Sequence, residues 1–203
     1  MNALALALAL AASAGPAAPE QPVELLGPGS FLVAPKAGLL LAPNGMGAAF
    51  DGALELGWRT PLLDRKLVVA LEGNFARPGR SGQLSDPRLA SGVSGAWQLE
   101  LRQVAVALSA VYRFDDAFER LTPYIGLGPT LSFDQAETTA FGSTTTEKAG
   151  RWGALAQVGA EYALWHGGAL LEARYHLTRV VFTSTGNAAA GGFELLAGYR
   201  FHL

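Results

Sequence analysis

A histidine, a hydroxyl and a carboxylate lie close together near the end of the chain. His176 and Thr178 are two residues apart in an alternating segment, so both side chains point to one face, and Glu194 opens the next such segment. A hydroxyl activated by a histidine that a carboxylate orients is the general arrangement of nucleophilic catalysis. The alternative is structural, because Glu172, Arg174 and His176 are also the polar face of a strand whose other face is apolar. We favour the structural interpretation and expect no catalytic residue.

A larger set of ionisable residues shares the polar faces of several alternating segments. Its members are Lys36, Glu55, Arg59, Glu72, Glu161, Glu172, Arg174, His176 and Arg200. Charges enclosed in a narrow interior are costly unless they are paired or hydrated. We therefore expect an ion-pair network that fills the interior. The alternative is a gated pore, in which rearranged Glu–Arg pairs open a path for water.

Composition argues against several other classes of site. The three histidines are scattered and the carboxylates are not clustered, so no spacing typical of a metal site is present, and we expect no metal and no cofactor. The absence of cysteine removes disulfides and thiol catalysis. A net charge of −2 gives no footprint for nucleic acid.

Eight segments that alternate with period two must position these residues, as half-buried strands do. The expected strands are Phe31–Ala42, Ala48–Thr60, Leu67–Arg77, Ala96–Phe114, Thr122–Asp134, Arg151–Trp165, Ala169–Phe182 and Gly191–His202. Each is long enough to cross a bilayer when tilted. Short connections alternate with longer ones such as Pro78–Gly95 and Gln135–Gly150, which is typical of an up-and-down barrel with tight periplasmic turns and longer outer loops.

The fourth segment breaks the alternation. Trp97, Leu99 and Leu101 share one face, whereas the apolar residues from Val104 to Phe114 share the other. One extra residue near Arg102-Gln103 would restore a continuous apolar face, so we predict a β-bulge there.

Aromatic residues gather toward the two ends of the expected strands. The expected membrane-interface set is Phe50, Phe75, Trp97, Phe133, Trp152, Phe182 and Phe193 at the outer ends, and Trp58, Tyr112, Phe114, Tyr124, Tyr162, Trp165, Tyr199 and Phe201 at the inner ends. Two aromatic girdles are typical of a transmembrane β-barrel. A soluble β-sandwich, the alternative, predicts no such segregation.

The first thirty residues differ from the rest. Residues 1–14 have the short apolar run and the Ala12-Ser13-Ala14 cleavage site of a signal peptide. Residues 15–30, with four prolines, are expected to be an irregular periplasmic lead-in. Residues 31–203 are expected to form one all-β domain, an eight-stranded antiparallel up-and-down transmembrane barrel.

Two stretches resemble a known family. The final GFELLAGYRFHL and the segment Val106–Phe133, with its strand, short turn and Pro-Tyr-Ile-Gly-Leu-Gly, resemble small outer-membrane barrels of the OmpA/OmpX type. Leu203 stands where that family usually ends in an aromatic residue. The His176-x-Thr178 pair with Glu194 is also similar to the His-x-Ser and acid of outer-membrane lipid A deacylases, but Thr178 and Arg179 depart from that pattern.

The resemblance implies the bacterial outer membrane, with both termini periplasmic after cleavage of the signal peptide. We expect a structural or surface-interaction protein with a mostly closed polar lumen. The alternatives are a small passive channel for ions or small hydrophobic solutes and, third, a lipid A-modifying enzyme. Expected partners are outer-membrane lipid and lipopolysaccharide, which Arg151 and Arg179 could contact, and the barrel-assembly machinery through the last strand; no nucleic acid is expected, and the protein is expected to be a monomer.

Overall fold

The computed structural model describes residues 30–43, 45–83, 95–182 and 186–203, and only the backbone is considered where residues 179–190 are described. The strands are β1 (Phe31–Leu41), β2 (Ala48–Arg59), β3 (Leu67–Ala76), β4 (Gly79–Gln83), β5 (Ala96–Arg113), β6 (Leu121–Ala140), β7 (Ser143–Leu164), β8 (Gly167–Phe182) and β9 (Gly186–His202). The expected segments 1–14 and 15–29 lie outside the described residues. Within the described residues, no helix has the length and hydropathy needed to cross a membrane.

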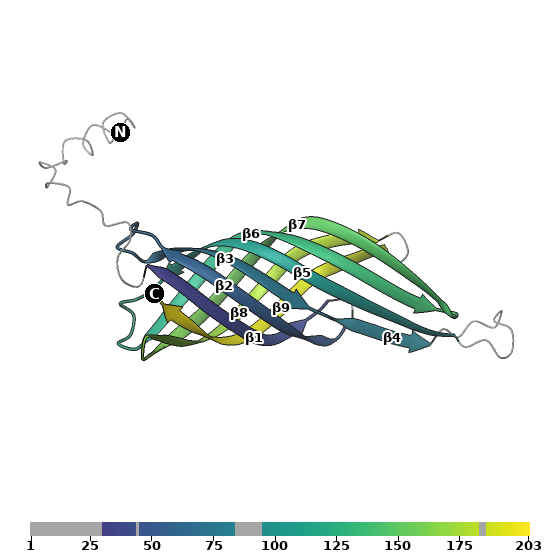
Figure 1. The fold of residues 1–203 in the computed structure, drawn as a ribbon, viewed down its shortest axis with the longest axis horizontal. Coiled ribbons are helices and arrows are strands. Elements are labelled where there is room, and N and C mark those ends of the chain that lie inside the picture. The colour runs from purple at the N-terminus through teal and green to yellow at the C-terminus, as the bar shows by residue number, and fades with distance from the viewer. Residues whose placement is uncertain (1–29, 44, 84–94, 183–185) are drawn as a thin grey trace, which may run out of the picture.

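Eight of the strands close into an antiparallel barrel (Figure 1). Except for β3 and β4, neighbours along the chain pair in turn; β1 also pairs with β9, and β3 pairs with β5, so β4 lies outside the closed ring. Closure gives every barrel strand two partners, which satisfies its backbone hydrogen bonds along the paired length. The predicted all-β, eight-stranded antiparallel barrel is therefore confirmed.

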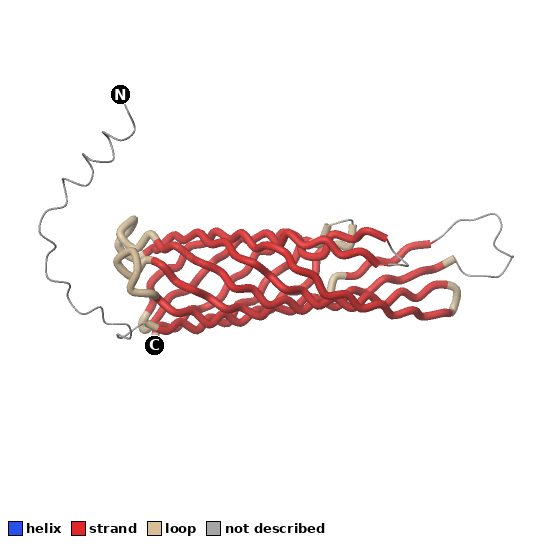
Figure 2. Tube along the Cα trace, turned by 90° about the horizontal axis from the view of Figure 1, so that it is seen from above, coloured by secondary structure: helices blue, strands red, loops and turns tan. Residues whose placement is uncertain are grey.

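The two ends of the barrel are built differently. At the end that we call the terminus end, Phe31 and Leu203 exchange backbone hydrogen bonds, and the turns between β2 and β3, β5 and β6, and β7 and β8 lie beside them. At the opposite end, here the extended end, β5, β6 and β7 continue beyond the rest of the barrel together with β4 (Figures 1 and 2). Chain connections at the terminus end are thus short turns, whereas at the extended end β6 and β7 project as one long hairpin.

The expectation that Gln135–Gly150 is a loop is wrong. β6 and β7 remain paired as far as Ala140 and Ser143, and Phe141 and Gly142 make the turn with φ of 53° and 77°. Two successive positive φ values match the twist of a two-residue β-hairpin turn. The Thr-rich run Thr144–Thr146 favours a strand because its side chains are β-branched. Strand β4 likewise falls inside the expected loop Pro78–Gly95.

The predicted β-bulge near Arg102-Gln103 is also wrong. The register between β5 and β6 is unshifted from Trp97↔Ala140 to Arg113↔Tyr124. Leu101 therefore shares the inward face with Ala105 and Ala107, and it packs in an apolar cluster with Met46 and Ala136. The outward face changes from polar to apolar between Arg102 and Val104 while the ladder stays regular. The reversed alternation therefore reflects the change of the outward face from polar to apolar, and not an extra residue.

Most of the expected interface aromatics point outward, but two do not. Outward-facing side chains include Phe50, Trp152 and Trp165, which are 66%, 74% and 95% exposed. Tyr124 is a correction, because it is fully buried inside the barrel. Trp97 is the second correction, since it has the inward parity of Leu101 and its ring lies under Arg80. The Phe182 side chain lies outside the described residues, and contact of the others with lipid stays a prediction.

Candidate functional site

A buried lysine is the first centre of the charged interior. Lys36 comes from β1, where alternate residues point inward, and its Nζ donates hydrogen bonds to Glu55 at 2.6 Å, Glu72 at 2.7 Å and Glu172 at 3.1 Å. Glu55 and Glu72 belong to the adjacent strands β2 and β3, whereas Glu172 belongs to β8. One ammonium group therefore joins carboxylates from three strands, and together with β1 the contacts link four strands, three of them consecutive in the ring.

A buried arginine is the second centre. Arg174 of β8 donates to Glu194 of the neighbouring β9 and to Glu72 of β3, and its third nitrogen lies 3.2 Å from Asp51 Oδ2 on β2. Glu172 Oε1 lies 3.6 Å from the same guanidinium. The guanidinium fork suits several carboxylates at once, since its five N–H donors point in fixed directions. Glu72 and Glu172 are shared with Lys36, so the two centres form one network.

Arg200 extends the network toward the terminus end. Its Nε donates to Glu55 Oε1 at 3.0 Å, and another nitrogen donates to Glu161 Oε2 at 2.9 Å. The Arg200 guanidinium also lies 4.9 Å from the centroid of the Tyr124 ring, and the Tyr124 hydroxyl donates to Glu172 at 2.9 Å. The ring thus fills space beside the charges while its hydroxyl stays hydrogen-bonded.

The last cluster lies close to the turns of the terminus end. Arg113 of β5 donates to Glu161 at 2.7 Å and to Asp115 at 3.2 Å. His202 Nε2 lies 2.7 Å from the other oxygen of Glu161. Arg59 is more exposed and lies 3.6 Å from Asp115. Paired charges therefore run from Asp51 and Glu194, which lie opposite Gly38 and Leu40 near the far end of β1, to the terminus end of the barrel.

Carboxylates outnumber permanent cations in this interior. The buried cations are Lys36, Arg113, Arg174 and Arg200, and the buried carboxylates in contact with them are Asp51, Glu55, Glu72, Glu161, Glu172 and Glu194. Removing one partner of a buried ion pair leaves an uncompensated charge and typically costs about 3–5 kcal/mol. Because most of these groups are shared by two centres, loss of one cation would leave several carboxylates facing one another.

The structure brings together nearly all of the expected lumen residues. Lys36, Glu55, Glu72, Glu161, Glu172, Arg174 and Arg200 form the network just described, His176 lies beside Glu194, and Arg59 lies at its end. Sequence reasoning missed Arg113 and the inward position of Tyr124. The alternation that points Tyr112 and Phe114 outward would have placed Arg113 inward. The partner of the Tyr124 hydroxyl had no comparable signal in the sequence.

The His176, Thr178 and Glu194 trio faces the interior and is buried. His176 Nε2 lies 3.4 Å from Glu194 Oε2, but Glu194 is already engaged by Arg174, and the Thr178 hydroxyl has no hydrogen-bond partner among the described residues. An enzyme that acts on a membrane lipid must present its nucleophile to the outward surface. This trio is enclosed by the barrel wall, so its geometry supports a polar interior better than lipid chemistry.

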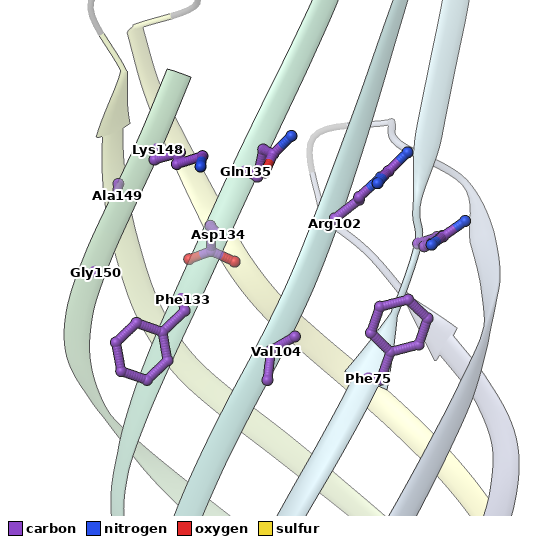
Figure 3. A pocket seen from close by; sticks show the side chains of 10 residues that line it. Phe75, Arg102, Val104, Phe133, Asp134, Gln135, Lys148, Ala149 and Gly150 are labelled. Atoms are coloured by element: carbon purple, nitrogen blue, oxygen red, sulfur yellow. The ribbon is translucent and has the colours of Figure 1, made fainter. Parts of the chain in front are cut away.

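A second feature is a shallow hollow on the outward surface near the extended end. It has a volume of ≈ 520 Å³ and is lined by Phe75, Arg77, Arg102, Val104, Phe133, Asp134, Gln135, Lys148, Ala149 and Gly150 (Figure 3). These residues come from β3, β5, β6 and β7 or directly follow β3. Among the described residues, no group of three or more His, Cys, Asp or Glu side chains could hold a metal ion, here or in the interior.

Three solved structures of other proteins have a similar architecture. Neisserial surface protein A is similar at 22% identity, with a TM-score of 0.54 over 88% of this chain and 100% of that one. The N-terminal β-barrel domain of Pseudomonas aeruginosa OprF is 14% identical, with a TM-score of 0.52 over 87% of this chain and 98% of that one. A major outer membrane protein of Thermus thermophilus is 15% identical, with a TM-score of 0.55 over 84% and 99%.

At these identities the likeness to solved structures shows the fold alone. No curated protein of known function matches the chain in sequence. The family described as "Outer membrane protein beta-barrel domain" matches residues 3–201, which is nearly the whole sequence. The chain belongs to the outer-membrane protein β-barrel domain family.

Proposed function

We propose that this protein is an integral outer-membrane barrel with a structural or surface-interaction role and a mostly closed polar lumen. The observation that carries the proposal is the network centred on Lys36 and Arg174, which joins strands from opposite parts of the ring through buried charged pairs. An eight-stranded barrel is only wide enough for its side chains to fill it. The network therefore acts as a plug that also ties the wall together.

We further propose that the terminus end faces the periplasm and that the extended end lies outside the cell. Short turns at one end and long hairpins at the other are typical of outer-membrane barrels. The projecting sheet of β4, β5, β6 and β7 would then be displayed at the surface, where it offers backbone and polar side chains to partners. Export by a cleaved signal peptide, assembly through the last strand and a monomeric state belong to the same proposal.

The experiment that tests the closed lumen is single-channel recording of the refolded protein in a planar bilayer. We expect the wild type to be silent, while Arg174→Ala, which leaves Glu72, Glu194 and Asp51 facing one another, admits water and ions. The matched control is Arg120→Ala, an exposed arginine at the terminus end. Folding of each protein is checked by the different gel mobilities of unboiled and boiled samples. Silence of both folded arginine variants would contradict a plug that depends on charge.

A small passive channel is the second candidate function. It is favoured by buried polar groups that have no hydrogen-bond partner in the described structure, namely the Thr130 and Thr178 hydroxyls and Gln157 Nε2. Such groups are compatible with a hydrated part of the lumen. Discrete conductance steps of the wild type that change in Arg174→Ala would make the channel the better assignment and would overturn the closed lumen.

A further inference from the structure

The hollow near the extended end is organised as two straight rows across four strands. Phe75 lies opposite Val104, Val104 opposite Phe133, and Phe133 opposite Gly150. Directly opposed residues of an antiparallel pair have Cβ atoms only about 5 Å apart. These four residues therefore form a continuous apolar row along the outward surface, and Gly150 leaves its end of the row open beside the Phe133 ring.

A cationic row lies two residues farther toward the extended end. Arg102 is opposite Gln135, and Gln135 is opposite Lys148. Arg77 follows β3 two residues after Phe75, so the same register brings it beside Arg102. Three cations are thus held in line directly above the apolar row, and all three are exposed.

The two rows lie where the outward surface of the strands changes from apolar to polar. Below the cationic row, the outward residues of β5 are Val104, Val106 and Leu108, whereas above it they are Glu100 and Gln98. Strands β6 and β7 show the same change between Phe133 and Gln135 and between Trp152 and Lys148. An outward surface that is apolar below this line and polar above it is what a membrane boundary requires. In the proposed orientation, the cations lie at the height of the lipid headgroups.

The charges around the hollow favour an anion. Arg77 stacks on the Phe75 ring, with 5.1 Å between guanidinium and centroid. Among the described residues, Arg102 lies 3.6 Å from the carboxylate of Glu100, and because both side chains are substantially exposed the pair is weak. Glu137 lies opposite Glu100 one row farther out, and Asp134 is buried on the inward face of β6. The row nearest the apolar floor is therefore positive.

We propose that this hollow binds a phosphorylated glycolipid of the outer leaflet, with a phosphate on Arg77, Arg102 and Lys148 and an acyl chain along the apolar row. Arginine recognises phosphate through paired charge-assisted hydrogen bonds, and lysine adds a point charge. A soluble anion would contact the cations but not the apolar row, and a neutral lipid would contact the apolar row but not the cations. This site rests on the proposed orientation of the barrel and does not depend on whether the lumen is closed.

The test is the binding of diphosphorylated lipid A to the refolded full chain in uncharged detergent micelles. Binding is followed by the shift in thermal unfolding midpoint and by lipid retained in native mass spectrometry. We expect the double variant Arg102→Gln/Lys148→Gln to weaken binding roughly tenfold or more, since it removes two charge-assisted contacts. The control Arg120→Gln removes an exposed cation at the terminus end and should bind like the wild type. Equal binding by the double variant would overturn the proposal.

Two further comparisons separate the sources of the phosphate. Gly150→Val fills the open end of the floor, where a Cβ meets nothing closer than 3.8 Å, so the barrel should fold. This variant should weaken binding of the lipid and leave any response to inorganic phosphate unchanged. The proposal is overturned if inorganic phosphate, phosphatidylglycerol or lipid A without phosphates shifts the wild-type midpoint as much as diphosphorylated lipid A does. Conductance is measured separately, so failure here and failure of the closed lumen are distinguishable.

Discussion

The closed barrel and the sheet that projects from it share strands β5, β6 and β7, yet they are held together in different ways. In the barrel, side chains from distant strands meet across the interior, as Lys36 of β1 meets Glu172 of β8. In the projecting sheet, β7 pairs with β8 only from Ala154 onward, so among the described residues the outer part of β7 pairs with β6 alone. Cross-barrel contacts make one region cooperative, while the other depends on local pairing.

The largest effect is expected from breaking the interior network at Arg174. Replacing Arg174 by Met keeps much of the volume but leaves Glu72, Glu194 and Asp51 without their shared cation. We expect the free energy of unfolding to fall by about 3–5 kcal/mol. The measurement is urea unfolding of the refolded protein followed by tryptophan fluorescence, with the exposed Arg77→Met as control. A loss no larger than that of the control would mean that the carboxylates are hydrated or protonated without cost.

The next effect tests how closely the barrel strands approach. A Cβ added at Gly38 of β1 would overlap the backbone oxygen of Leu195 on β9, whereas one added at Gly73 of β3 meets nothing within 4 Å. Gly38→Ala should therefore destabilise the barrel by roughly 1–3 kcal/mol, as overpacking does. Gly73→Ala is the matched control and should leave the unfolding midpoint nearly unchanged. Equal midpoints for the two variants would show that β1 and β9 can move apart freely.

The sequence predicted the barrel well because one physical rule applies along most of its length. Alternation placed Lys36, Glu72 and Arg174 inward and gave all eight barrel strands, since lipid-facing and interior-facing residues must differ in polarity. The pairing of these residues was not predictable, because Lys36 and Glu172 are 136 positions apart and meet only when the ring closes. The same holds for Tyr124, whose hydroxyl reaches Glu172 from the other side.

The same rule failed where the strands leave the proposed membrane. On β5 the apolar residues Leu99 and Leu101 point inward because the outward face there is polar, so the alternation reverses while the register does not change. The reversal resembles the effect of an extra residue, which is why the predicted β-bulge is wrong. The polar run after Asp134 likewise resembles a loop in sequence, because no apolar face marks a strand that has polar surroundings on both sides.

The projecting hairpin should tolerate shortening. Deleting residues 139–140 and 143–144 removes two opposed pairs and leaves Thr138 opposite Thr145 around the Phe141-Gly142 turn, which keeps the alternation of hydrogen-bonded pairs. We expect the free energy of unfolding to change by less than about 1 kcal/mol, because local pairing at an exposed end contributes little to global stability. Gel mobility of unboiled samples and urea unfolding check the result. Failure of the shortened protein to fold would mean that the hairpin nucleates the barrel.

The smallest effect is expected from Lys66, which forms one of two ion pairs of similar length at the terminus end. Lys66 Nζ lies 2.6 Å from Asp116 Oδ2, and Arg113 lies 2.7 Å from Glu161, but the Asp116 side chain is 81% exposed while Glu161 is buried. Arg113→Gln should lower the free energy of unfolding as the interior variants do, by several times more than Lys66→Gln. The unfolding midpoints of the two variants check this difference, and equal losses would show that burial does not decide the value of a pair.

The pH and salt dependence of the exposed pair follows from its chemistry. The hydrogen bond to the Asp116 carboxylate raises the pKa of Lys66 above its usual value. A raised pKa means that any stabilisation is present at neutral pH and is lost only as the pH rises through that higher value. Added salt should also remove it, because exposed charges are screened. The difference in unfolding midpoint between wild type and Lys66→Gln should therefore shrink from low to high salt at pH 7. A difference that stays large and constant would contradict the assignment of this pair to the solvent-exposed surface.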